Sequence, residues 1–129
     1  MHRILFVLMT GMIALMSACT AQSQTTVTAA QTEEMLQKDP STQLVDLRTQ
    51  AEINQTGKIA GAKHINFNSP DFQTQIGQLD KNKPVIVYCA SGGRSPRAAA
   101  AMTKMGFKTV YDYAGGMNDW KAKGKKTVQ

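Results

Sequence analysis

The sequence has few cysteines, few histidines and no long hydrophobic run. Two cysteines among 129 residues exclude the disulfide-rich scaffolds of many small secreted domains. The two histidines belong to no cluster with metal-ligand spacing, so we predict neither a metal site nor a cofactor. The main apolar stretch, Ile4 to Leu15, has twelve residues, whereas a membrane-spanning helix needs about 20. We therefore expect no transmembrane helix.

The first eighteen residues form a segment of their own. A short basic start precedes the apolar stretch and small residues follow it, so residues 1–18 are typical of a secretory signal peptide. Ser17, Ala18 and Cys19 resemble the lipobox of bacterial lipoproteins. That resemblance implies a lipid on Cys19, and the polar composition of residues 19–27 predicts a flexible tether before a domain at 28–129. The alternative is an ordinary signal peptide cleaved near Ala21.

A lipid on Cys19 has consequences for location and for the remaining thiol. We expect the protein in the cell envelope, anchored by the lipid only and facing the periplasm, because a multiply acylated cysteine holds a membrane firmly. Thr20 is not the acidic residue that often signals inner-membrane retention, which favours the outer membrane. Cys89 is then the only free thiol, and a lone exported cysteine is a liability unless it is buried or chemically used.

Helix and strand signals alternate through the expected domain. We predict helices over residues 28–38, 50–55, 70–76, 95–105 and 117–123, and strands over residues 43–47, 64–67, 85–89 and 109–113. Thr28 and Gln31 form a capping-box pattern, and Gly106 fits the end of the alanine-rich helix. The apolar run Val85 to Tyr88 is typical of a strand buried on both faces. This alternation predicts an α/β fold with a mostly parallel sheet and helices on both faces.

The predicted strand 85–89 ends on Cys89, and a glycine-containing loop joins it to the next helix. Its residues are Ala90, Ser91, Gly92, Gly93 and Arg94, with Ser95 at the helix start. Ligands of parallel sheets bind at the carboxyl ends of strands, and a helix N-terminus presents unpaired N–H groups to an anion. Such a cradle lowers the pKa of a thiol and makes it a nucleophile. The alternative is a buried, inert cysteine at the end of a core strand.

Residues 89–95 resemble the active-site loop of rhodaneses, which is commonly Cys-x-x-Gly-x-Arg-Ser. Three further segments also resemble that family and extend the likeness over about residues 26–123: Val45 to Arg48 with Glu52, Gly57 to Ile65, and Tyr111 to Trp120. The resemblance implies about five strands and a sulfurtransferase that carries sulfane sulfur as a Cys89 persulfide. The donor would be an anion such as thiosulfate, and the acceptor thiophilic, cyanide in vitro. It also implies that Asp46 braces the loop and that Arg48 pairs with Glu52.

Other readings of the same residues remain open. The domain could be a sulfur-carrier or protein-interaction module, or a periplasmic redox-sensing thiol. A cysteine phosphatase uses Cys-x5-Arg, one residue longer than the spacing from Cys89 to Arg94. We expect a monomer that binds a small anionic sulfur donor, with a protein thiol as a possible acceptor. We expect no nucleic-acid partner, because the lysines after Trp120 have no interleaved aromatic residues and fit a solvated, frayed terminus.

Overall fold

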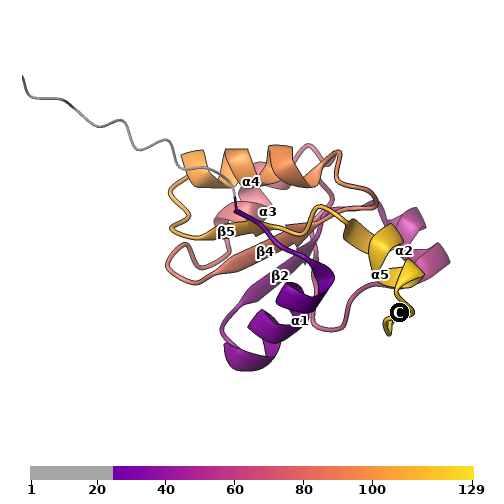
Figure 1. Cartoon of the computed structure of the whole chain (residues 1–129). Coiled ribbons are helices and arrows are strands. Elements are labelled where there is room, and N and C mark those ends of the chain that lie inside the picture. The colour runs from indigo at the N-terminus through magenta and orange to yellow at the C-terminus, as the bar shows by residue number, and fades with distance from the viewer. Residues whose placement is uncertain (1–24) are drawn as a thin grey trace, which may run out of the picture.

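Five parallel strands form one sheet in the computed structural model, which describes residues 25–129 (Figure 1). The strands are β1 (Thr25–Thr26), β2 (Gln43–Asp46), β3 (Lys63–His64), β4 (Val85–Tyr88) and β5 (Val110–Asp112), in the order β1-β5-β4-β2-β3. The helices are α1 (Ala29–Lys38), α2 (Gln50–Thr56), α3 (Phe72–Gly77), α4 (Ser95–Lys104) and α5 (Gly116–Ala122). All four strand pairings are parallel, so the predicted α/β fold is confirmed.

Helices cover both faces of the sheet (Figure 1). α3 and α4 pack on one face, where Ile76, Ala98 and Met102 meet the valines of β2 and β4. α1 and α5 pack on the other, where Met117 and Trp120 lie among buried side chains. Every residue of β4 is buried, as its apolar run predicts for a central strand. No helix of residues 25–129 is long and apolar enough to cross a membrane.

Local signals explain where the helices begin and end. Thr28 Oγ1 accepts the N–H of Gln31 at 3.2 Å, and the Gln31 side chain accepts the N–H of Thr28 at 2.8 Å, so the predicted capping box is confirmed. Thr49 and Glu52 form a second capping box at the start of α2. α4 ends at Lys104, and Gly106 follows with a φ of 97°, a left-handed conformation that suits glycine.

Two predicted elements differ in extent from the observed ones. The strand expected over residues 64–67 is β3 and ends at His64, although the N–H of Phe67 still donates to the carbonyl of Leu47 at 3.0 Å. The helix expected from Pro70 begins at Phe72, because residues 69–71 form a turn first. Strand and helix ends are set by pairing and turn geometry that composition resolves poorly.

The folded part begins earlier than the predicted tether boundary. Thr25 and Thr26 form β1 and pair with Tyr111 and Asp112, and Val27 is buried. Residues 25–27 therefore belong to the domain, because they pair with β5, which would otherwise present an unpaired edge. The predicted tether extends to residue 27 because threonine is polar enough for a linker, although its branched side chain also suits a strand. The predicted signal peptide, Cys19 and residues 20–24 lie outside the described residues.

The basic end of the chain folds back onto the domain. Lys125 Nζ lies 2.7 Å from Glu33 Oε2 of α1, and Lys58 pairs with Val128 in an antiparallel bridge. The indole N–H of Trp120 donates to the carbonyl of Lys126 at 2.9 Å. The predicted frayed terminus is therefore wrong, because specific backbone and charge contacts outweigh the polar composition. Trp120 itself packs in the core beneath this end of the chain, since the residue is 4% exposed.

Candidate active site

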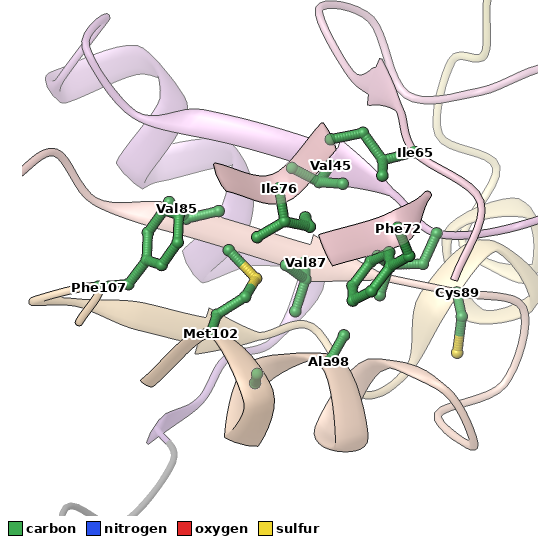
Figure 2. Packing of buried hydrophobic residues seen from close by; sticks show 12 residues of the cluster. Val45, Ile65, Phe72, Ile76, Val85, Val87, Cys89, Ala98, Met102 and Phe107 are labelled. Atoms are coloured by element: carbon green, nitrogen blue, oxygen red, sulfur yellow. The ribbon is translucent and has the colours of Figure 1, made fainter. Parts of the chain in front are cut away.

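Cys89 stands directly after β4, at the carboxyl end of the most buried strand. Figure 2 shows it at the end of the row of core residues, with its sulfur turned away from Val87 and toward the loop that leads into α4. The residue is 1% exposed. Among residues 25–129 it is the one free cysteine, and no group of three or more His, Cys, Asp or Glu side chains there could hold a metal ion.

Hydrogen-bond donors of the following loop converge on the Cys89 sulfur. The N–H of Gly92 lies 3.2 Å from Sγ, and the Ser95 hydroxyl oxygen lies 3.7 Å from it. Burial raises the pKa of the Cys89 thiol, but hydrogen bonds from the backbone of Ser95, Arg94 and Gly92 outweigh it. The pKa is therefore below its ordinary value, which favours the nucleophilic thiolate.

The start of α5 holds the outer side of the same loop. The N–H of Met117 donates to the carbonyl of Cys89 at 2.9 Å, and the N–H of Asn118 donates to that of Ala90 at 3.0 Å. Gly116 makes this approach possible, because a Cβ there would lie 2.4 Å from the Cys89 oxygen and its φ is 64°. With these two carbonyls bound by α5, the loop N–H groups remain available to the sulfur on the inner side.

Arg94 pairs with a carboxylate of α2. Its Nη1 and Nη2 donate to the two carboxylate oxygens of Glu52 at 2.9 and 2.7 Å, a bidentate ion pair. The hydrogen bonds from Arg94 hold the pKa of Glu52 at about 2, well below its ordinary value. The Glu52 carboxylate and, to a smaller extent, the nearby Cys89 sulfur raise the pKa of the Arg94 guanidinium. The ion pair thus carries a nearly balanced charge beside the thiol.

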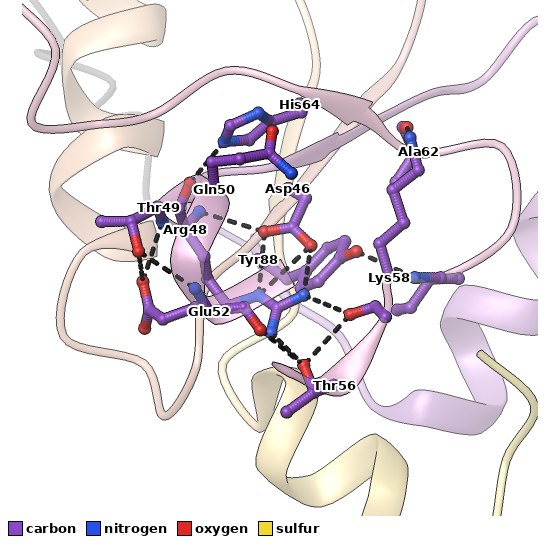
Figure 3. Close-up of polar contacts among 12 residues, drawn as sticks. Asp46, Arg48, Thr49, Gln50, Glu52, Thr56, Lys58, Ala62, His64 and Tyr88 are labelled. Atoms are coloured by element: carbon purple, nitrogen blue, oxygen red, sulfur yellow. Dashed lines mark hydrogen bonds and ion pairs between the residues drawn. The ribbon is translucent and has the colours of Figure 1, made fainter. Parts of the chain in front are cut away.

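A second ion pair, which is buried, joins Arg48 to Asp46 at the end of β2 (Figure 3). Arg48 Nη2 donates to Asp46 Oδ2 and to the carbonyl of Gly57, both at 2.7 Å, and Arg48 Nη1 donates to Thr56 at 2.7 Å. These bonds tie the end of β2 to the end of α2. The predicted pair of Arg48 with Glu52 is wrong, because Arg48 precedes α2 and turns inward while Glu52 faces the loop.

The predicted brace between Asp46 and the 89–95 loop also needs correction. The Asp46 carboxylate binds the backbone N–H and the side chain of Arg48, at 2.7 to 3.2 Å. His64 supports the same turn, since its Nε2 lies 2.6 Å from the Arg48 carbonyl. Asp46 and Arg48 therefore position the segment that precedes α2, and α2 carries Glu52 to Arg94.

Residues 28–123 match the family described as "Rhodanese-like domain". The chain belongs to the rhodanese family. It is 38% identical over 80 residues to the thiosulfate sulfurtransferase GlpE of Shewanella oneidensis, and the match covers 62% of this chain and 76% of that protein. It is 32% identical over 91 residues to the putative sulfur carrier protein YrkF of Bacillus subtilis, but that match covers 70% of this chain and only 48% of the relative.

A solved structure has the same fold. The polysulfide-sulfur transferase homodimer from Wolinella succinogenes superposes with a TM-score of 0.71 and 28% sequence identity. The alignment covers 81% of this chain and 78% of that one. The sheet and helices described above are thus those of a rhodanese domain.

Within this rhodanese domain the predicted loop residues surround the thiol unequally. Gly92, Arg94 and Ser95 supply the groups that reach the sulfur, Ala90 joins the loop to α5, and Ser91 and Gly93 lie on the exposed side. Sequence reasoning missed that Gly116 and the first turn of α5 hold this loop. The paired glycines 115 and 116 are the available signal in the sequence.

Proposed function

We propose that this rhodanese is a sulfurtransferase that carries sulfane sulfur on Cys89. The observation that carries the proposal is the set of N–H groups that converge on a thiol whose pKa is lowered. The Cys89 thiolate attacks the outer sulfur of a donor such as thiosulfate, an S–S bond forms to that sulfur, and the original S–S bond breaks with sulfite as the leaving group. The negative charge passes to the terminal sulfur of the persulfide, where the loop N–H groups stabilise it.

The second half of the cycle returns the enzyme to its starting state. A thiophilic acceptor, cyanide in vitro, attacks the terminal sulfur, forms a bond to it, and releases the Cys89 thiolate. No general base is needed, because the nucleophile is already ionised and the leaving group is an anion. The similarity to a thiosulfate sulfurtransferase supports thiosulfate as the donor.

Intact mass before and after thiosulfate treatment tests this proposal. The expected adduct is one sulfur atom, removable by cyanide with release of thiocyanate, and Cys89→Ser should show neither adduct nor thiocyanate. A shortened chain that starts at Gln22 keeps β1 and suits the measurement, because Cys89 is its only cysteine. Normal turnover by Cys89→Ser would refute the mechanism.

A sulfur-carrier role is the second candidate, favoured by the similarity to a putative sulfur carrier protein. In that case a partner protein persulfide, rather than thiosulfate, loads Cys89. Loading rates from thiosulfate and from a persulfidated protein thiol distinguish the two roles. Fast loading from the protein alone indicates a carrier, and fast loading from thiosulfate indicates the enzyme.

We also propose that Cys19 is lipidated and anchors the protein in the cell envelope, facing the periplasm. The support is the signal-like sequence of residues 1–18 and the short polar segment that separates Cys19 from β1. The full-length protein should partition with membranes and be released by detergent, and Cys19→Ala should accumulate as a longer precursor. A soluble wild-type protein with a mature N-terminus beyond Cys19 would refute the anchor and leave the sulfur chemistry untouched.

A further inference from the structure

Asp112 is a buried carboxyl group beside the active site that the proposed mechanism does not use. It is the last residue of β5 and is 4% exposed. Its Oδ1 atom is fully buried and has no hydrogen-bond partner within residues 25–129. An unpartnered carboxylate is costly in such a place, because burial penalises the charged form far more than the neutral one.

The position of Asp112 in the sheet brings it close to the thiol. Asp112 lies opposite Val87 of β4 in the sheet register, and Val87 belongs to the core cluster that includes Cys89. The Ser95 hydroxyl lies close enough to the Asp112 carboxyl to lower its pKa, and the same oxygen lies 3.7 Å from Cys89 Sγ. Ser95 itself is completely buried. The three side chains therefore form a continuous polar chain, with Ser95 in the middle.

Among residues 25–129, the elements that surround Asp112 supply no positive charge to it. On the α4 side, Arg94 is paired with Glu52, and Arg97 is exposed and lies over the Phe67 ring. The neighbouring strands carry no charge, since β4 reads Val-Ile-Val-Tyr and β1 is two threonines. Burial raises the pKa of Asp112, and the Ser95 hydrogen bond only partly opposes it. These surroundings favour the protonated carboxyl.

The protonation state of Asp112 decides what Ser95 can do, because a serine hydroxyl has a single proton to donate. Beside an ionised Asp112, Ser95 donates to the carboxylate and can only accept from the sulfur, which favours the thiol. Beside a protonated Asp112, Ser95 accepts from the carboxyl and donates to the sulfur, which favours the thiolate. We propose that Asp112 is a positioning residue that stays protonated and, through Ser95, directs the serine proton at the Cys89 sulfur.

This inference rests on the proposed function only in treating Cys89 as the reacting atom. The test measures the rate of Cys89 alkylation by iodoacetamide against pH in the full chain, with the alkylated site identified by peptide mass spectrometry. Alkylation needs no sulfur transfer, so the failure of sulfur transfer and the failure of this inference are distinguishable.

Two variants that keep the branch of the side chain at Cγ carry the test. Asp112→Asn keeps a neutral group that can donate to Ser95, so the pKa of Cys89 should stay at its wild-type value. Asp112→Leu keeps neutrality but loses the donor that orients the Ser95 hydroxyl, so the pKa of Cys89 should rise by about half a unit to one unit, as expected when a hydrogen bond to the thiolate is weakened. In a Ser95→Ala background the two variants should become equal.

Each other outcome overturns the inference. If both variants lower the pKa of Cys89, Asp112 is ionised in the wild type and acts as a repelling charge. If neither variant moves it, or both raise it equally, Asp112 has a structural role only. Asp80→Asn, which removes an exposed carboxylate in a distant turn, is the charge control and should leave the alkylation profile unchanged.

Discussion

Replacing Arg94 with alanine tests how the proposed donor anion is held. Arg94 makes two charge-assisted hydrogen bonds to Glu52 and lies near the Cys89 sulfur. Its loss removes a positive charge from the site and leaves the Glu52 carboxylate without its partner, and both changes disfavour an anionic donor. A charge-assisted hydrogen bond contributes about 1.5 to 3 kcal/mol. Because the two side chains are 21% and 33% exposed, solvent screening favours the lower end.

The expected result is a rise in the KM for thiosulfate of about tenfold to thirtyfold, since about 1.4 kcal/mol corresponds to a factor of ten. The assay is steady-state thiocyanate formation at fixed cyanide and varied thiosulfate. The double variant Glu52→Gln with Arg94→Ala should recover part of the loss, because it also removes the stranded negative charge. Glutamine can still accept the Thr49 N–H at the start of α2, so the helix cap is kept.

Arg97→Ala is the matched control, because Arg97 lies three residues further on and stacks over Phe67 in an exposed position. It should leave the KM unchanged. An unchanged KM in Arg94→Ala would show that the loop N–H groups hold the donor without help from this charge. A double variant no better than Arg94→Ala would show that the Glu52 charge is not felt by the donor.

Two further predictions concern the supports of the site. Gly116→Ala should lose both stability and sulfur transfer, because its Cβ would press on the Cys89 carbonyl. Gly61 has a φ of 81° and open space around it, so Gly61→Ala should keep its activity. In urea unfolding, its free energy of unfolding should fall only by the cost of a left-handed alanine, about 1 to 2 kcal/mol. The low pKa of Glu52 means that its contribution to stability is complete above about pH 4.5 and is lost as the pH falls toward 2. Glu52→Gln should remove about 1 to 2 kcal/mol from that part of the acid unfolding curve, after allowance for screening, and Glu34→Gln at an exposed pair should not alter it.

The sequence predicts the sheet and the thiol loop because their signals are local. The apolar run of β4, the capping box at Thr28 and Gly106 after α4 each act through residues a few positions apart. Proximity in the chain also places Gly92, Arg94 and Ser95 around Cys89. The cover of helices on both faces then follows from the alternation of strand and helix, whereas the order of the strands and the pairing of β1 with β5 do not.

The partners that sequence reasoning missed are distant in the chain or weak in pattern. Arg94 and Glu52 are 42 residues apart, and the residues around each of them do not indicate the other as a partner. The family resemblance implied a pair of Arg48 with Glu52, but Arg48 lies before α2 and pairs with the buried carboxylate of Asp46. Asp112 reads as an ordinary polar residue at the end of a strand, and only the register of β5 against β4 brings it to the site.

The part of the chain that the structure describes has no thiol besides Cys89, and this bears on the redox-sensing alternative. A reversible oxidant sensor commonly needs a resolving cysteine to trap the sulfenic acid as a disulfide. Cys89 has no such neighbour among residues 25–129, and its first oxidation product would be open to further, irreversible oxidation. The persulfide needs no resolving thiol, because its terminal sulfur is removed by the acceptor. A cradle of N–H groups with a nearly balanced Arg94–Glu52 charge is also better suited to a small, diffuse anion than to a neutral oxidant. Both arguments favour sulfur transfer at Cys89.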